Sequence, residues 1–181
     1  MKSALVLLAP GFEEVEAITI IDLLRRAEIT VTTASIANKE VTGSHNIPVI
    51  ADTLVHQVSH IDYDIILLPG GPGVSKLANS EEVNKLIKTQ AMKDKLLGAI
   101  CAAPSVLNNA GLLKKKSVTS YPSEEKTFTD SNYLYENVVV DGKIITSRAV
   151  GTAMDFSLKV IEILMGKEKA EDVAEKILHT N

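Results

Sequence analysis

The amino-terminal part of the chain reads SALVLLAPGFEEVEAITIIDLLRRAEITVTTASI over residues 3–36. Its first and last segments, Ala4 to Ala9 and Val31 to Ile36, are short apolar runs typical of strands in a sheet that is covered on both faces. Between them, apolar residues recur at every third position from Val15 to Leu24, which is the spacing of an amphipathic helix. The stretch therefore predicts two parallel strands joined by a crossover helix.

The same alternation continues along the rest of the chain. Further strands are predicted at Asp64 to Leu68 and Leu97 to Ile100, and Asp141-Gly142 between VVV and KIIT predicts a hairpin over Val138 to Ser147. Helical patterns cover the segments Ser80 to Lys93, Pro104 to Gly111, Thr152 to Met165 and Ala170 to Leu178. We therefore expect an α/β fold with a mostly parallel central sheet and helices on both faces, as a single domain over residues 1–181.

Composition and charge exclude several classes of protein. Hydrophobic residues make up 45% of the 181 residues and charged residues 23%, which is typical of a globular protein and excludes a disordered, collagenous or coiled-coil chain. There are 19 lysines and arginines against 23 acidic residues, so the net charge is −4. A chain with no excess of positive charge is a poor general binder of nucleic acid or of anionic membranes.

Cysteine usage and the lengths of the apolar runs indicate a compartment. Cys101 is the single cysteine, so we expect no intrachain disulfide and no cysteine-based zinc site, which fits a reducing environment. The first apolar run meets Glu13 and Glu14 rather than a small-residue cleavage site, and no run approaches the roughly 18 residues of a membrane span. We therefore expect a cytoplasmic protein that binds a small molecule or another protein.

The segment Gly98 to Pro104, GAICAAP, places Cys101 between an apolar strand and a helix. Such a turn points its apex residue out of the carboxyl edge of a sheet, and small neighbours allow the tight backbone that it needs. The free N–H groups at the start of the helix are expected to lower the pKa of the thiol. We interpret Cys101 as a nucleophile or a redox sensor, and a buried structural cysteine is the alternative.

Two further segments are expected at the same edge. Leu68 to Gly73, LPGGPG, directly follows a strand, and its glycines allow backbone N–H groups to face an anion, with a simple tight turn as the alternative. Glu16 lies on the apolar flank defined by Ile20 and Leu23, where burial raises the pKa of a carboxyl group. A protonated Glu16 can serve as general acid and base beside the thiol, and an ordinary carboxylate at a helix start is the alternative.

The histidines do not indicate a metal site. His56 and His60 are four residues apart in HQVSH, but Gln57 stands where the zinc-protease pattern has its glutamate, and no third ligand is evident. No histidine lies between Cys101 and Ala170, so a cysteine-histidine pair of the papain type is not readable. We expect neither a metal nor an organic cofactor.

Four motifs follow one another along the chain: APGFEEVEA from residue 9, LPGGPG from 68, GAICAAP from 98, and TSRAVGTAMDFSLKVIEIL from 146 with GKEKA after it. In this order they resemble the ThiJ/PfpI (DJ-one) superfamily over essentially the full length, closest to its branch of protein deglycases and YajL-like proteins. Because all four motifs occur in the same order, the resemblance is far more specific than any one motif.

The resemblance implies a flavodoxin-like sandwich that forms a homodimer, with a reactive Cys101 on a nucleophile elbow. It implies Glu16 as the partner of the cysteine, and Gly70, Gly71 and Ala102 as the backbone donors of an oxyanion or anion pocket. Members of the family are described as converting methylglyoxal and glyoxal to hydroxy acids without glutathione. Others act on early glycation adducts or on oxidants, or serve as chaperones.

One position departs from the family pattern. Animal members that act as glyoxalases carry a histidine in the segment that reads Thr119-Ser120-Tyr121-Pro122 here, and Tyr121 is the matching residue, where the bacterial branch also lacks histidine. A tyrosine can hydrogen-bond a substrate, but a pKa near 10 makes it a poor proton shuttle at neutral pH. The tyrosine therefore argues against a fast glyoxalase, but it does not argue against a reactive thiol at Cys101.

The leading hypothesis is a cofactor-free enzyme of the glyoxalase III or protein deglycase type. Cys101 would add to the aldehyde of a reactive dicarbonyl, free or on a glycated protein, and Glu16 would move the proton between carbons. The alternative is an oxidative-stress sensor or chaperone in which Cys101 is oxidised to a sulfinic acid beside a protonated Glu16. An intracellular peptidase is a third reading, disfavoured because Ala102 occupies the place of the histidine that the peptidase branches use.

Overall fold

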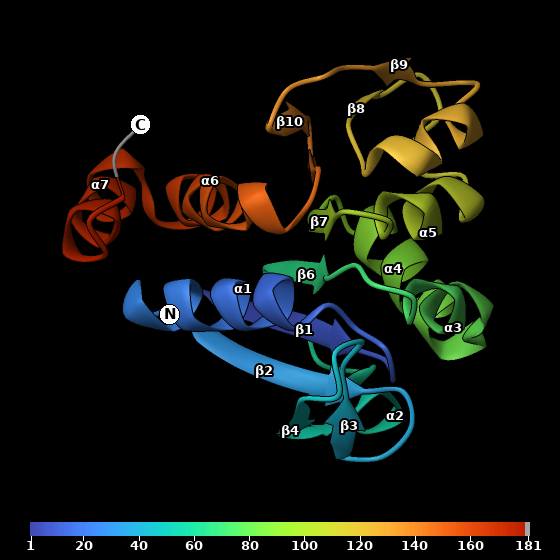
Figure 1. Ribbon diagram of the computed structural model, residues 1–181, viewed down its shortest axis with the longest axis horizontal. Helices are drawn as coiled ribbons and strands as arrows, with labels where there is room; N and C mark the ends of the chain where they lie inside the picture. The colour runs from blue at the N-terminus through green and yellow to red at the C-terminus, as the bar shows by residue number, and fades with distance from the viewer. Residues whose placement is uncertain (180–181) are drawn as a thin grey trace.

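The computed structural model describes residues 1–179 and contains a central seven-stranded sheet (Figure 1). Its strands are β1 (Ser3–Leu8), β2 (Thr30–Ser35), β5 (Thr53–Leu54), β6 (Ile65–Leu68), β7 (Leu96–Ile100), β10 (Val138–Asp141) and β11 (Ile144–Ser147). They lie in the order β10-β11-β7-β6-β1-β2-β5, and every neighbouring pair is parallel except the antiparallel hairpin β10-β11 at one edge. The predicted hairpin around Asp141-Gly142 is confirmed.

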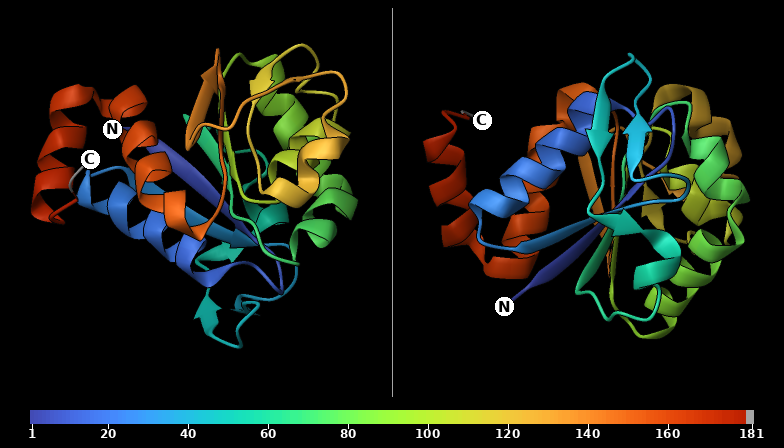
Figure 2. Two further views of the ribbon diagram at one scale, coloured as in Figure 1. Left: turned by 45° about the horizontal axis from the view of Figure 1, so that its top comes forward. Right: turned by 90° about the horizontal axis from the view of Figure 1, so that it is seen from below.

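Helices cover both faces of this sheet. They are α1 (Glu14–Arg26), α2 (Val55–Val58), α3 (Val74–Asn79), α4 (Glu81–Met92), α5 (Pro104–Asn109), α6 (Ala153–Met165) and α7 (Lys167–Lys176), with 3-10 turns η1 (Pro122–Thr127) and η2 (Val150–Thr152). Figure 2 shows α1, α6 and α7 on one side of the sheet and α2 to α5 on the other. The predicted α/β class, a mostly parallel sheet between helices, is confirmed.

The two layers of core follow from the alternation of side chains along each strand. Val6 and Leu8 of β1 pack with the residues of α1 and α6, whereas Leu5 and Leu7 pack with those on the opposite face. All four side chains are buried, because a central parallel strand is covered on both sides. The short apolar run near the start of the sequence therefore forms a strand that is buried between the two layers of helices.

The topology places the carboxyl ends of the central strands side by side. β1, β6, β7 and β11 all run in the same direction and are neighbours within the sheet. The chain leaves these strands at Leu8, Leu68, Ile100 and Ser147, so the loops that follow lie along one edge. In open parallel sheets, this is the edge at which ligands bind.

Several short elements differ from the sequence-based expectation. The hairpin of β3 (Glu40–Thr42) with β4 (Pro48–Ile50) and the pair β8 (Ser117–Val118) with β9 (Asn132–Tyr133) have no clear sequence signal, because such short ladders carry little periodicity. Helix α7 begins at Lys167, three residues before the predicted start at Ala170. Its first turn is charged and mostly exposed, so it lacks the apolar pattern on which the prediction relied. Among the described residues, no helix has both the length and the apolar character needed to cross a membrane.

Candidate active site

Cys101 stands at the turn between β7 and α5, as predicted. Its φ of 64° is left-handed, a conformation that costs a residue with a side chain about 1–3 kcal/mol. Backbone hydrogen bonds hold it from both sides: the Cys101 N–H donates to the carbonyl of Ser147 at 3.1 Å, and the Tyr121 N–H donates to the carbonyl of Cys101 at 2.8 Å. The half-buried Cys101 is thus fixed at the carboxyl edge by backbone hydrogen bonds to β11 on one side and to the start of η1 on the other.

Glu16 approaches the same point from the first turn of α1. Its side chain is fully buried, as the apolar flank predicts, and its Oε2 accepts a hydrogen bond of 2.8 Å from the Gly70 N–H. Within residues 1–179, its Oε1 has no hydrogen-bond partner. Burial raises the pKa of the Glu16 carboxyl to about 7, against the opposing effect of the Gly70 hydrogen bond. This carboxyl therefore exchanges a proton near neutral pH.

Gly70 separates the carboxyl from the thiol. A methyl group at this position would lie 2.5 Å from the Cys101 Cβ, 2.7 Å from the Glu16 Oε2 and 2.9 Å from the Cys101 Sγ. Real contacts of this kind are essentially never so short, so only glycine allows Glu16 and Cys101 to share the space. The assignment of Gly70 to the oxyanion pocket is wrong in this structure, because its N–H is already bonded to Glu16.

The pKa of the Cys101 thiol differs from the expectation. Burial, the negative charge of Glu16 and a hydrogen bond to that carboxylate raise it to about 12, whereas the N–H groups of Gly71 and Ala102 favour the thiolate and lower it. The predicted net lowering of this pKa is therefore wrong: the N–H groups at the helix start do favour the thiolate, but burial and the adjacent Glu16 outweigh them. Because each group raises or lowers the charge that the other can hold, Glu16 and Cys101 titrate as one coupled pair.

Gly71 and Ala102 are the other two residues that the resemblance implies for the anion pocket. Their backbone N–H groups face the sulfur, and Gly71 has a φ of 92°, which an L residue rarely adopts. Both residues also border a groove of about 410 Å³ between α3, α5 and η1. The groove carries Ser105, Asn109 and the carboxyl of Glu124 on its walls. A reacting group at the sulfur would thus have donors for a developing negative charge and space beside it.

Tyr121 lies next to the elbow but touches it through its backbone. The N–H bond to the Cys101 carbonyl places the residue at the sheet edge, while its side chain is 46% exposed. The phenol has no hydrogen bond within the described part of the chain. The structure therefore brings Tyr121 to the site without giving its hydroxyl a fixed position.

Three residues beside the site have contacts that the sequence did not reveal, since Glu13 and Glu14 read as ordinary acids at a helix start and His45 as a loop residue. Glu13 accepts the Glu16 N–H at 2.7 Å as the cap of α1, and Glu14 is buried under the β3-β4 turn, where it binds His45. Oxygen and nitrogen atoms of Glu13, Glu14 and His45 lie within 4.8 Å of one another, a spacing that a metal ion could use. The Glu14 oxygens are already engaged by hydrogen bonds, so we describe the group as a hydrogen-bonded cluster. The acidic first turn carries no signal for the burial of Glu14, because the turn that covers it lies about 30 residues further along the chain.

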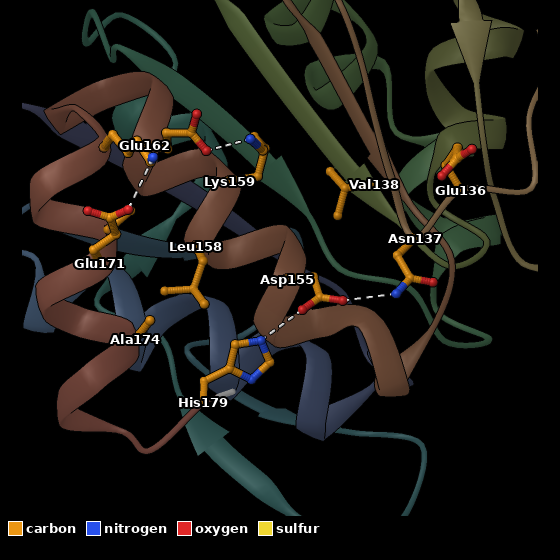
Figure 3. A pocket seen from close by; sticks show the side chains of 12 residues that line it. Glu136, Asn137, Val138, Asp155, Leu158, Lys159, Glu162, Glu171, Ala174 and His179 are labelled. Carbon is orange, nitrogen blue, oxygen red and sulfur yellow. Dashed lines mark hydrogen bonds and ion pairs between the residues drawn. The ribbon is translucent and has the colours of Figure 1, made fainter. Parts of the chain in front are cut away.

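A second cavity, also of about 410 Å³, lies between α6, α7 and the segment that precedes β10 (Figure 3). Asp155 links its walls by accepting hydrogen bonds of 2.9 Å from His179 and 3.0 Å from Asn137. Its lysines lie beside glutamates, Lys159 with Glu162 and Lys167 with Glu171, so the cavity has little unpaired charge. None of the predicted site residues lines it.

Comparison with known proteins gives concordant results. The model of the DJ-1/PfpI family matches residues 2–163. The Drosophila melanogaster protein dj-1beta is 46% identical over 98% of this chain and 97% of its own, and the Caenorhabditis elegans glutathione-independent glyoxalase DJR-1.2 is 38% identical over 95% and 94%. The structure of oxidized Toxoplasma gondii DJ-1 superposes with a TM-score of 0.97 at 37% identity, covering all of both chains. The similarity extends over essentially the full length of the chain and of its fold, and the chain belongs to the DJ-1/PfpI family.

Proposed function

We propose that this protein is a cofactor-free enzyme that converts reactive dicarbonyls into hydroxy acids. The observation that carries the proposal is the fully buried Glu16 carboxyl, with a pKa of about 7, placed across Gly70 from a strained Cys101. A structural cysteine needs neither the left-handed conformation nor a buried acid beside it. A relative that is named a glutathione-independent glyoxalase supports this reaction class.

The first step is addition of the thiol to the aldehyde carbon. The S–H bond breaks, a C–S bond forms, and the thiol proton passes to the Glu16 carboxylate. The aldehyde oxygen becomes an oxyanion that accepts hydrogen bonds from the Gly71 and Ala102 N–H groups. The pKa of about 12 for the thiol means that this step needs a base, and Glu16 is the base at hand.

The second step is an internal redox reaction of the bound adduct. The oxyanion takes the proton from Glu16, and the carboxylate then removes the proton from the former aldehyde carbon, which leaves an enediolate. Glu16 delivers that proton to the neighbouring carbon, while the hydroxyl proton passes from the first oxygen to the second. The first carbon is oxidised to a thioester and the second is reduced to an alcohol, so no outside oxidant is needed. Water then cleaves the C–S bond and releases the hydroxy acid and the thiol. The groove beside Gly71 and Ala102 offers space for a glycated side chain carrying the same dicarbonyl.

The test is formation of lactate from methylglyoxal without glutathione. We expect lactate from the wild-type protein and at least a 100-fold loss in Cys101→Ser and in Glu16→Gln, as for removal of a nucleophile or a general base. Lactate formation that survives either substitution would overturn the assignment of that residue. A glycated peptide offered under the same conditions would show whether repair accompanies detoxification.

Oxidation of Cys101 is the second candidate function, and the geometry of the same donors favours it. A sulfinate at Cys101 would place oxygens within reach of the Gly71 and Ala102 N–H groups, and the protonated Glu16 could donate to it. Titration with peroxide followed by intact mass would show a gain of two oxygens at Cys101 with the fold retained. A sensor would do so without lactate formation.

A further inference from the structure

The groove beside Gly71 and Ala102 contains a single charged side chain. Small, apolar and neutral polar residues make up its walls together with one acidic residue, Glu124, and no lysine or arginine of the described chain lines it. The half-buried Glu124 carboxyl accepts a hydrogen bond of 3.1 Å from the neutral hydroxyl of Ser123. The ion pairs within residues 1–179 do not include it. The groove therefore carries a negative charge that no neighbouring cation balances.

Backbone and side-chain hydrogen bonds fix Glu124 relative to the nucleophile elbow. Its N–H donates to the carbonyl of Tyr121 at 3.0 Å, and the Tyr121 N–H donates to the carbonyl of Cys101 at 2.8 Å. The hydroxyl of Thr127 donates to the carbonyl of Glu124 at 2.7 Å, and the side-chain amide of Asn108 donates to the carbonyl of Thr127 at 2.9 Å. The turn η1 is thus attached both to the elbow and to α5, so Glu124 belongs to a fixed wall of the groove.

The two parts of the groove differ in the groups that they offer a ligand. Where it meets the sulfur, the N–H groups of Gly71 and Ala102 are hydrogen-bond donors. Along its walls, the hydroxyls of Ser75 and Ser105 already donate to backbone carbonyls at 3.1 Å and 2.6 Å, so their oxygens remain as acceptors. The carboxylate of Glu124 only accepts, and the asparagine amides can do either. Such a groove suits a molecule with negative charge developing at one end and positive charge at the other.

Resting on the function proposed above, we infer that the groove selects dicarbonyl compounds that carry a positive charge, with Glu124 as the specificity-determining residue. The aldehyde reacts at Cys101, and an ammonium or guanidinium group on the same molecule lies toward Glu124. A cavity of about 410 Å³ is roughly 9 Å across, so a bound substrate brings its far end within that distance of the carboxylate. Attraction over this distance, partly screened by water, favours a cation over a neutral group by about fivefold and disfavours an anion by a similar factor.

Three phenylglyoxals test this selection, because they share the reacting group and differ only in the para substituent: trimethylammonium, hydrogen or carboxylate. The trimethylammonium group has no N–H, so it reports charge alone. The assay measures kcat/KM for formation of the mandelate without glutathione, at low ionic strength. Since the substituents also change the reactivity of the aldehyde, ratios to the neutral compound are compared between protein variants.

We expect the cation-to-neutral ratio of kcat/KM to be about fivefold higher in wild type than in Glu124→Gln, and the anion-to-neutral ratio about fivefold lower. Glu124→Lys should shift both ratios further in the direction of Glu124→Gln, and 0.5 M salt should reduce the differences. Glu125→Gln is the matched control, because Glu125 is the next residue of η1 but accepts a hydrogen bond from Tyr135 and does not line the groove. This variant should keep the ratios of wild type.

The outcomes separate this inference from the proposed function. A wild-type protein that converts neither methylglyoxal nor any phenylglyoxal overturns the proposed function itself. Conversion of methylglyoxal alone would show that the groove does not receive the rest of the substrate, and would overturn the inference. Equal ratios in wild type and Glu124→Gln would also overturn it. So would an equal shift in Glu125→Gln, because the net charge of the protein and not the groove would then set the preference.

Discussion

Replacing Glu16 by glutamine should stabilise the protein at neutral pH while it abolishes activity. The folded state holds the carboxyl with a pKa of about 7, against 4.5 for an unperturbed glutamate. At about 1.4 kcal/mol for each pH unit, this difference corresponds to roughly 3 kcal/mol. Because the folded-state pKa is the higher one, the folded protein binds the proton more tightly, and Glu16 reduces stability as the pH rises from 4.5 to about 7.

Glutamine at position 16 has no charge to desolvate, and its carbonyl oxygen can still accept the Gly70 N–H. The free energy of unfolding of Glu16→Gln relative to wild type should therefore increase by roughly 3 kcal/mol between pH 4.5 and pH 8. Urea unfolding of both proteins, at one protein concentration and at both pH values, measures this difference directly.

Glu14→Gln is the matched control, two residues earlier in the same turn. The pKa of Glu14 is lowered to about 2, so its stabilising effect is complete above pH 4.5 and is lost only as the pH falls toward 2. This variant should be less stable than wild type, by an amount that stays constant between pH 4.5 and pH 8. The reasoning fails if Glu16→Gln shows the same constant difference, because burial would then not be acting on the Glu16 charge.

Three further predictions follow from other parts of the structure. Gly70→Ala should cost about 1–3 kcal/mol of stability and most of the reactivity of the thiol toward iodoacetamide, whereas Gly151→Ala, where an added Cβ meets nothing within 4 Å, should leave both unchanged. Tyr121→His should raise the rate of lactate formation about tenfold by adding a proton shuttle at the site, and an unchanged rate would mean that proton transfer there is not limiting. His179→Ala should lower the free energy of unfolding by about 1 kcal/mol by removing the 2.9 Å contact with Asp155, an effect that weakens in high salt if it is ionic.

Much of the fold could be predicted because its signals are local. The runs that became β1, β6 and β7 are apolar on both faces, and Ser80 caps α4 through its hydroxyl as its place before two glutamates suggests. The site could be located because Cys101 and the glycine loop both follow such strands. Because both segments directly follow parallel strands, the sequence was enough to predict that they lie at the same edge of the sheet.

The finer assignments failed where they depended on distances across the fold. Nothing in the sequence shows that the Gly70 N–H would be taken by Glu16, or that the Glu16 charge would outweigh the helix start at Cys101. The burial of Glu14 under the β3-β4 turn is equally hidden, because that turn packs on α1 from about 30 residues further along the chain. Electrostatic effects depend on separations of a few ångströms, which local sequence patterns do not contain.

Because the backbone at position 101 is left-handed, a cysteine at this position indicates that its side chain is selected for a function other than stability. Glycine would adopt this conformation without strain, so a chain kept only for its fold would gain roughly 1 kcal/mol by exchanging its cysteine for glycine. Random mutation finds such stabilising changes readily when nothing opposes them. The protein therefore carries a cysteine at a position where glycine would give a more stable fold. A relative without this cysteine would be expected to have lost the activity while keeping the fold.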